Sequence, residues 1–390
     1  MLAFKLALKN LLGAGLRTWL NVIVLSFTFI MIIWLKGLLE GWDRQAKNDM
    51  IKWEIGAGQF WHSSYDPYDP LTLSDSHGTI PDILSDSVKS GSLVPVLLSQ
   101  GTIYPNGRMQ SVLIKGISPE QEVLALPSLK LKSDDVDIPA IIGKSMAGST
   151  QLKEGDYVTL RWRDKNGTFD ATEIRITAIF DTNVPTVDVG QVWLSIDKVR
   201  EMMLLPGEAT LLITDREGWQ STDSDEWIFK DQETLLSDIE NIIKAKSFVG
   251  IIIWAILLMM AMLAVFDTQV LSIFRRQKEI GTYVALGMTR GQVVKLFTIE
   301  GAMHSVLAAL VAAVYGIPLL ALQAIRGISI PVESKDFGIA MAAKLYPVYS
   351  LALISGTIII VLLVTTIVSY WPSRKIARLN PTEALRGRIL

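Results

Sequence analysis

The chain of 390 residues contains no cysteine and only three histidines. The absence of cysteine excludes disulfide bonds and thiolate metal sites. The histidines, His62, His77 and His304, show none of the short spacings that ligands of a zinc site have. The sequence therefore predicts no metal site.

A phosphate-binding loop is also missing. Gly143-Lys144-Ser145 resembles the end of such a loop, but the motif needs a glycine five residues before the Gly-Lys pair, where this chain has Ile138. None of the serines lies in a nucleophile elbow, and a catalytic triad would need one of the three histidines. We therefore expect a chain that is not an enzyme, with no catalytic residue and no cofactor of its own.

What the sequence does contain is long apolar runs. Half of the residues are hydrophobic, and four runs, at about 19–35, 248–266, 302–325 and 348–371, match the roughly 20 residues that cross a bilayer core. The segment 36–247 is polar and rich in Pro and Gly turns. The sequence therefore predicts an α-helical membrane protein with four transmembrane helices, one before and three after a large α+β domain.

The predicted organisation follows the chain in nine segments. They are an amphipathic helix (1–18), a first transmembrane helix (19–40), the α+β domain (41–247), a second transmembrane helix (248–272), a connector (273–300), a third transmembrane helix (301–325), a loop (326–347), a fourth transmembrane helix (348–371) and a tail (372–390).

Charge predicts the orientation of these segments. The N-terminal segment, the tail and the stretch 267–300 carry an excess of Lys and Arg, which places them in the cytoplasm by the positive-inside rule. Residues 36–247 have 21 Lys and Arg against 33 Asp and Glu, a net charge of −12. The acidic domain and the 326–347 loop are then predicted to lie outside.

Within the outer domain, periodicity predicts short alternating elements. Helices are expected at 81–89, 196–203 and 231–245, and at 141–151 with a start near Gly143. Strands are expected at 93–98, 101–104, 109–116, 157–162, 173–180, 192–194 and 210–214. Asn106-Gly107 and Asn166-Gly167 are typical of hairpin turns.

The connector is the most informative segment. Arg275, Arg276 and Lys278 follow an apolar run, where basic residues anchor the end of a span at the lipid headgroups. Gly281 and Gly287 permit close approach or chain reversal, and Gly287 fits a position just past a helix end. Further apolar surface that an isolated loop does not need comes from Thr282, Tyr283, Leu286 and Met288. This composition favours docking onto a partner protein over a solvated loop.

The same segment resembles a known family. Arg-Arg-Gln-Lys-Glu-Ile-Gly-Thr at 275–282 and Ala-Leu-Gly-Met-Thr-Arg-Gly-Gln at 285–292 resemble the coupling helix of FtsX-domain ABC permeases. That family includes the lipoprotein-release permeases LolC and LolE, which are closest in layout, and MacB. The tail, with Pro372, Ala377 and 380–386, is similar to the end of these proteins, and 7–12 with 17–18 to their start. Outer-domain segments 141–144, 152–158 and 176–180 resemble the MacB-type periplasmic core.

The resemblance implies a permease subunit in a bacterial inner membrane, with both termini cytoplasmic and the large domain periplasmic. It implies a second permease, either the same chain or a paralogue, and cytoplasmic ABC ATPase subunits that carry ATP and Mg²⁺. No nucleic-acid partner is expected. The implied ATPase-coupling residues are Arg275, Arg276, Gln277, Lys278, Glu279, Gly281, Tyr283, Leu286, Gly287, Met288 and Arg290.

For the substrate, the resemblance implies that ATP hydrolysis drives extraction of lipoproteins toward the outer membrane, with membrane lipids and a periplasmic carrier as further partners. The absence of an ATPase segment favours this arrangement over that of MacB. The implied acyl-chain site lies between the first and second spans, at Phe27, Ile30, Met31, Trp34, Leu38, Val249, Ile252, Ile253 and Leu257. MacB-like efflux of peptides or amphiphiles, and FtsX-like mechanotransmission without transport, are the alternatives.

Overall fold

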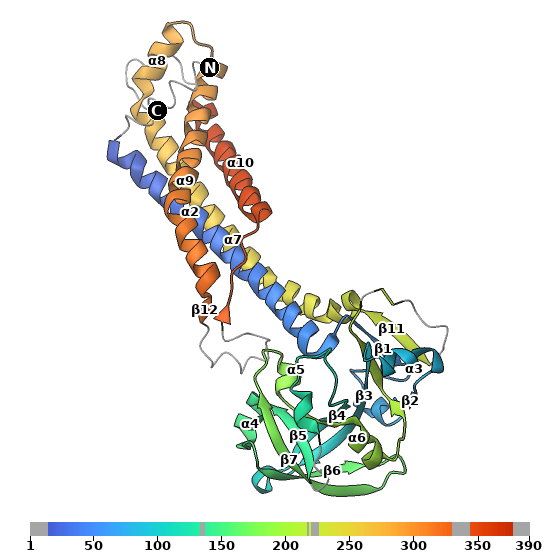
Figure 1. Cartoon of the computed structure of the whole chain (residues 1–390). Coiled ribbons are helices and arrows are strands. Elements are labelled where there is room, and N and C mark those ends of the chain that lie inside the picture. The colour runs from blue at the N-terminus through green and yellow to red at the C-terminus, as the bar shows by residue number, and fades with distance from the viewer. Residues whose placement is uncertain (1–14, 133–136, 217, 220–225, 330–343, 377–390) are drawn as a thin grey trace. The chain divides into compact units, whose positions relative to one another are not determined.

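The structure, a computed structural model, describes residues 15–132, 137–216, 218–219, 226–329 and 344–376 (Figure 1). They form two compact units. Of the described residues, those within 15–42, 243–329 and 345–376 form the helical unit, and those within 43–242 form the α/β unit together with Lys344. Most of the predicted 1–18 helix and 326–347 loop, and the tail from residue 377, lie outside the described residues.

Four long helices dominate the helical unit, where they run alongside one another (Figure 1). They are α2 (Gly15–Met50), α7 (Gln232–Arg275), α9 (Arg290–Arg326) and α10 (Leu351–Ile376). By length and composition, four segments are apolar enough to cross a membrane: Trp19–Ile55, Gly250–Ser272, Arg290–Arg326 and Leu351–Arg374. Each predicted apolar run therefore falls in a helix of this kind.

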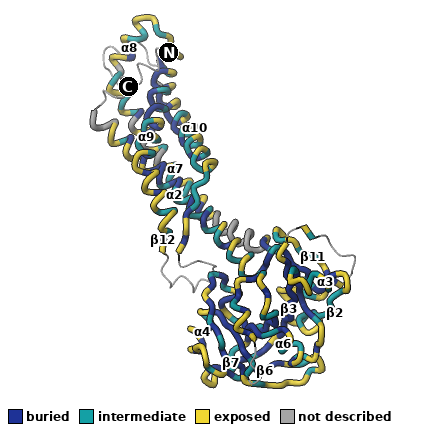
Figure 2. Tube along the Cα trace, in the orientation of Figure 1, coloured by how far each residue is buried: buried dark blue, intermediate teal, exposed yellow. Residues whose placement is uncertain are grey.

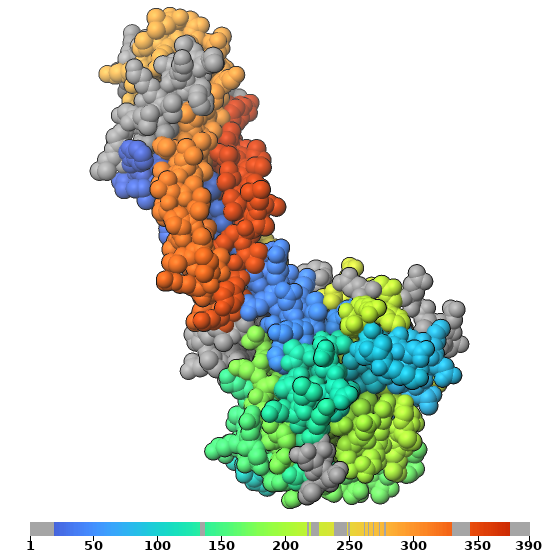
Figure 3. Space-filling view, viewed as in Figure 1, coloured from blue at the N-terminus to red at the C-terminus, as the bar shows by residue number. Residues whose placement is uncertain are grey.

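Small and hydroxyl side chains join these helices inside the bundle. Ser305 Oγ of α9 lies 2.8 Å from Thr365 Oγ1 of α10, and Ser26 Oγ of α2 lies 2.9 Å from the Tyr315 hydroxyl of α9. Close packing and interhelical hydrogen bonds of this kind bind helices together where lipid removes the hydrophobic driving force. In Figure 3, α9 (orange) lies directly against α10 (red).

The α/β unit is built on a nine-stranded sheet in the order β11-β1-β10-β3-β4-β8-β5-β7-β6. The strands are β1 (Gly58–His62), β3 (Leu93–Ile103), β4 (Gln110–Ile117), β5 (Ile138–Gly143), β6 (Tyr157–Arg163), β7 (Phe169–Phe180), β8 (Gln191–Ser195), β10 (Leu211–Thr214) and β11 (Trp227–Asp231). The α-helices are α3 (Asp82–Lys89), α4 (Lys144–Thr150), α5 (Pro185–Asp188) and α6 (Ile196–Met203). Short elements complete the set: a π-helix (Ile51–Ile55), 3-10 turns (Pro70–Ser74, Pro105–Gly107, Ser128–Leu131) and the strands β2 (Gly78–Thr79), β9 (Glu208–Ala209), β12 (Ile328–Ser329) and β13 (Lys344–Leu345).

Strand β3 closes part of this sheet into a ring. Its first residues pair with β10, whereas Gly101–Ile103 pair with β6, so β3, β4, β8, β5, β7 and β6 form a closed six-stranded barrel. Side chains on a strand point alternately to opposite faces. Accordingly, Val192 and Leu194 belong to one buried cluster with Leu97 and Ile142, while Trp193 belongs to a second cluster on the opposite face. Figure 2 shows these strands as largely buried.

Most predicted elements of this unit are confirmed, and the differences have simple causes. The helix at 196–203 and the 106–107 turn between two antiparallel strands are as predicted. The segments 93–98 and 101–104 form one strand, because Ser99, Gln100 and Gly101 continue the pairing with β4. The predicted helix at 141–151 begins only at Lys144, since Ile141 and Ile142 complete β5. Strands β1 and β11 were not predicted.

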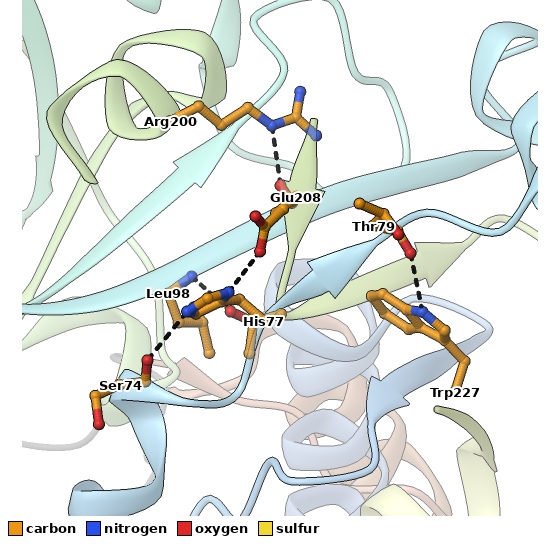
Figure 4. Close-up of polar contacts among 8 residues, drawn as sticks. Ser74, His77, Thr79, Leu98, Arg200, Glu208 and Trp227 are labelled. Carbon is orange, nitrogen blue, oxygen red and sulfur yellow. Dashed lines mark hydrogen bonds and ion pairs between the residues drawn. The ribbon is translucent and has the colours of Figure 1, made fainter. Parts of the chain in front are cut away.

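A polar cluster ties the loop before α3 to the sheet (Figure 4). Strand β2 pairs with β9, and His77 Nδ1 lies 2.5 Å from Glu208 Oε2. His77 Nε2 also lies 3.0 Å from the carbonyl oxygen of Ser74, and Arg200 Nε donates to the Glu208 carbonyl at 2.9 Å. One histidine therefore connects the 3-10 turn at Pro70–Ser74 with β9.

We predict that His77→Ala loosens this connection. Loss of two hydrogen bonds, one of them to a carboxylate, should lower the free energy of local unfolding by about 2 kcal/mol. Hydrogen exchange of the full chain should then be faster at the amides of β2 and β9. Lys89→Ala is the control, because the Lys89–Asp86 pair is well exposed and exposed pairs contribute little. Equal exchange rates in the two variants would contradict the prediction.

Candidate coupling site

The segment between α7 and α9 forms a helical hairpin. Helix α7 ends at Arg275, and α8 (Gln277–Ala285) follows after a break at Arg276, where φ is −100° and ψ is 19°. Gly287 has a φ of +99°, a conformation that favours glycine and reverses the chain. Thr289 then caps α9 in a reciprocal pair of hydrogen bonds with Gln292.

The inner face of α8 is apolar and packs on the start of α9. Ile280, Val284 and Met288 contact Val293 and Phe297, and Ile280, Val293 and Phe297 are buried. A helix as short as α8 is marginal by itself in water. Its position therefore depends on this packing, which makes α8 and the first turns of α9 one body.

A buried ion pair locks the same body to the end of α7. Arg276 Nη1 donates to both carboxylate oxygens of Glu300 at 2.9 Å, and Arg276 Nε donates to Glu279 at 2.7 Å. The guanidinium carbon lies 5.1 Å from the ring centroid of Phe297. Next to it, His304 Nδ1 donates to the Glu300 carbonyl oxygen at 2.8 Å. We call Arg276, Glu279, Glu300 and Phe297 the arginine clamp.

The charges of the arginine clamp complement one another. Burial by itself would lower the pKa of Arg276, but the carboxylates of Glu300 and Glu279 outweigh this effect and hold that pKa above its ordinary value. The Glu300 side chain is only 7% exposed. Because a buried carboxylate needs a partner, loss of Arg276 would leave an uncompensated charge between the helices.

The outer face of α8 and the turn after it are open. Leu286, at the end of α8, is 79% exposed, and Figure 2 shows most of this hairpin tip as exposed. The predicted coupling residues therefore divide into three groups. Arg275, Lys278, Glu279, Leu286, Gly287 and Arg290 are exposed, Arg276, Tyr283 and Met288 are half-buried, and Gly281 is buried. The Gln277 side chain lies outside the described residues.

The sequence prediction missed the partner of Arg276. Neither Glu300 nor Phe297 is among the predicted coupling residues. The available signal was a carboxylate at the start of an apolar run, 24 residues after an arginine at the end of the preceding one. A hairpin brings those two ends together, and charges within spans are paired.

The predicted substrate residues lie in the helical unit, partly at its surface. Phe27, Ile252 and Ile253 are exposed, with 59%, 46% and 43% of their surface accessible. Met31, Trp34, Leu38 and Leu257 are half-buried. Ile30 is buried, because it packs on Gly316 of α9, and is not accessible at the surface of a single chain. The Val249 side chain lies outside the described residues.

Helices α2 and α7 meet close to these residues. Gly250 leaves room for the Leu39 side chain, and Lys36 Nζ lies 5.0 Å from the ring centroid of Trp254. The indole N–H of Trp34 is buried without a hydrogen-bond partner among the described residues. The structure thus brings together the parts of α2 and α7 on which the substrate prediction rests.

Comparison with known proteins identifies the class. Residues 251–381, which include α8 and the arginine clamp, match the FtsX-like permease C-terminal domain. The chain therefore contains an FtsX-like permease domain. Among its relatives, the macrolide export ATP-binding/permease protein MacB of Sodalis glossinidius is 34% identical over 131 residues, which are 33% of this chain and 18% of that protein.

Two further relatives are ABC transporter permeases. One, from Methanocaldococcus jannaschii, is 28% identical over 155 residues, which are 40% of this chain and 36% of the relative. YknZ of Bacillus subtilis is 24% identical over 220 residues, or 56% of this chain and 50% of the relative. The matched segments thus cover from about a fifth to half of these relatives. The chain is a homologue of ABC transporter permeases.

We predict that the arginine clamp stabilises the helical unit. Arg276→Met should lower its stability by about 3 kcal/mol, because Glu300 stays buried without a partner. Thermal unfolding of the full chain in lipid nanodiscs measures this, and Arg276→Met with Glu300→Leu should recover part of the loss. Lys278→Met, at an exposed position on the same helix, is the control. Single and double variants of equal stability would contradict a coupled pair.

Proposed function

We propose that this chain is the membrane permease of an ABC transporter and that α8 receives the motion of a cytoplasmic ATPase. The observation that carries the proposal is the combination, in an FtsX-like permease domain, of an exposed tip at Leu286 with the arginine clamp behind it, in which Arg276 binds the buried Glu300. A docking site needs an accessible anchor, and transmission needs a rigid attachment. The hairpin supplies both.

The attachment determines where the motion goes. The arginine clamp joins the end of α7 to α8 and α9. A force on the hairpin tip at Leu286 therefore acts on both α7 and α9. Helix α7 is continuous over 44 residues, from Gln232 after β11 to Arg275, which is roughly 66 Å of helix. We propose that α7 passes the displacement to the α/β unit, which would lie in the periplasm of a bacterium while the hairpin and both termini face the cytoplasm.

We further propose that the cargo is a lipoprotein, extracted from the inner membrane toward a periplasmic carrier. Removing an acyl chain from a bilayer costs about 0.8 kcal/mol for each CH₂ group, so extraction needs ATP hydrolysis and another apolar surface. Phe27 of α2 and Ile252 and Ile253 of α7 are exposed, and they would supply that surface together with a second permease.

Efflux of peptides or amphiphiles is the second candidate. It is favoured by the similarity to MacB, whose name states that it exports macrolides. The exposed apolar residues of α2 and α7 suit either cargo, so the two candidates differ in what stimulates ATP hydrolysis.

Leu286→Asp is predicted to uncouple the ATPase. A charge at the exposed tip should weaken docking about tenfold or more, as loss of an interface anchor does. The readout is ATP hydrolysis by the co-expressed ATPase in nanodiscs with the full chain. Leu71→Asp is the matched control, because Leu71 is 84% exposed in the α/β unit. If both variants stimulated hydrolysis like the unchanged chain, α8 would not be the docking element.

A release assay separates the two cargoes. The chain with its ATPase is reconstituted with a triacylated lipoprotein, and we expect ATP-dependent transfer to a soluble acceptor that stops when the ATPase is inactivated. Phe27→Ser should reduce this transfer, because it removes exposed apolar surface, without lowering basal hydrolysis. No transfer, with hydrolysis stimulated by amphiphilic peptides instead, would favour efflux. No transfer and no stimulation by any cargo would contradict both.

A further inference from the structure

The α/β unit contains a cavity that none of the functions above uses. It has a volume of about 740 Å³ and lies against the face of the sheet that carries Trp193. This volume is within the range of small-molecule sites, roughly 300–1,000 Å³. The residues that matter for its chemistry are Glu54, Trp61, Tyr65, Lys115, Trp193 and Lys230.

The walls of the cavity are aromatic and cationic. Trp61 and Tyr65 pack edge to face with centroids 5.0 Å apart. Lys115 Nζ lies 4.9 Å from the ring centroid of the fully buried Trp193, and Lys230 Nζ lies 6.0 Å from that of Trp61. Rings of this kind provide a flat apolar surface, and the two ammonium groups lie beside it.

The buried acceptor groups along the cavity already have partners. One oxygen of Glu54 accepts from Lys115 at 3.1 Å, and the other accepts from the Thr186 hydroxyl at 2.8 Å. Gln59 Oε1 accepts from the indole N–H of Trp61 at 2.7 Å. Asp66, an exposed acid at the cavity, accepts from the backbone N–H of Tyr68. The buried carboxylate of the cavity is thus engaged, and the exposed Asp66 is the acid that a cationic head could reach.

Hydrogen-bond donors of the cavity, in contrast, remain available to a ligand. Within the described residues, the Lys115 ammonium has one side-chain acceptor, Glu54, so two of its three N–H groups are left. The Tyr65 hydroxyl has no hydrogen-bond partner there, and burial raises its pKa to about 12, which keeps it a donor at neutral pH. The indole N–H of Trp193 is also buried without a partner in the described part of the chain. The cavity thus combines apolar walls with an excess of donors.

We propose that this cavity binds a small amphiphile with a carboxylate head. Its apolar body would lie on the partly exposed rings of Trp61 and Tyr65, and the carboxylate would accept from Lys115 and from the Tyr65 hydroxyl. Lys115 and Glu54 compensate each other in charge, and Lys230 adds a further positive charge at the wall, opposite in sign to the exposed Asp66. This site does not depend on the proposed function, because it lies within the α/β unit and needs no transport.

The test uses the full chain in nanodiscs and a photoreactive probe, decanoate with a terminal diazirine. After irradiation, mass spectrometry should find saturable labelling of the peptide that contains Trp61 and Tyr65. Unlabelled decanoate should compete about tenfold better than decanol, because hydrogen bonds to a charged group are stronger. Equal competition by decanol, or labelling that does not saturate, would overturn the proposal.

Variants sharpen this test. Tyr65→Phe removes one donor and keeps the ring, so it should weaken decanoate binding about tenfold. Tyr157→Phe is the matched control, because the Tyr157 hydroxyl bonds Asp137 away from the cavity. Lys115→Met should abolish labelling, but it also deprives Glu54 of its partner, so circular dichroism must show a folded chain. Equal binding by the Tyr65→Phe and Tyr157→Phe variants would refute the assigned head-group position.

Discussion

The pairing of Arg276 with Glu300 is the constraint on which the proposed transmission of motion through α8 depends. A carboxylate enclosed between helices is stable only if a cation stays next to it, and here that cation lies in the break between α7 and α8. The pair therefore fixes the angle at which the hairpin leaves the bundle. Without it, the apolar packing of Ile280 on Phe297 would still attach α8 to α9, but the end of α7 would lose its ion pair with that body.

Local sequence signals predicted much of the fold. The alternation of polar and apolar residues was sufficient for β6, and helical periodicity was sufficient for α6. Asn106-Gly107 marked the turn between β3 and β4. These elements form from neighbours in the chain. Closure of the barrel was not predictable in this way. It depends on the pairing of Gly101–Ile103 with Leu160–Trp162, about sixty residues later. The residues of neither segment indicate which strand it pairs with.

The residues of the candidate sites show the same difference between local signals, which the sequence reveals, and contacts of distant segments, which it does not. Exposed residues of α8 were found from sequence, because charge and glycine placement reveal a surface helix. Arg276 was taken for a headgroup anchor, since its buried acceptor lies on the other arm of the hairpin. The Glu54–Lys115 pair was missed for the same reason: a π-helix and a central strand, 61 residues apart, contribute one group each. Contacts between distant segments are what the sequence pattern does not contain.

The closed barrel also limits how other proteins can bind the α/β unit. A sheet edge is where an incoming peptide adds a strand, through main-chain hydrogen bonds. Because β3 seals the ring through β6, the sheet ends at β11, a strand of only five residues. The described part of the nine-stranded sheet therefore offers a full free strand edge for such an addition at β11. A partner that binds the barrel itself has to recognise side chains. Its specificity then depends on loop residues rather than on main-chain hydrogen bonds.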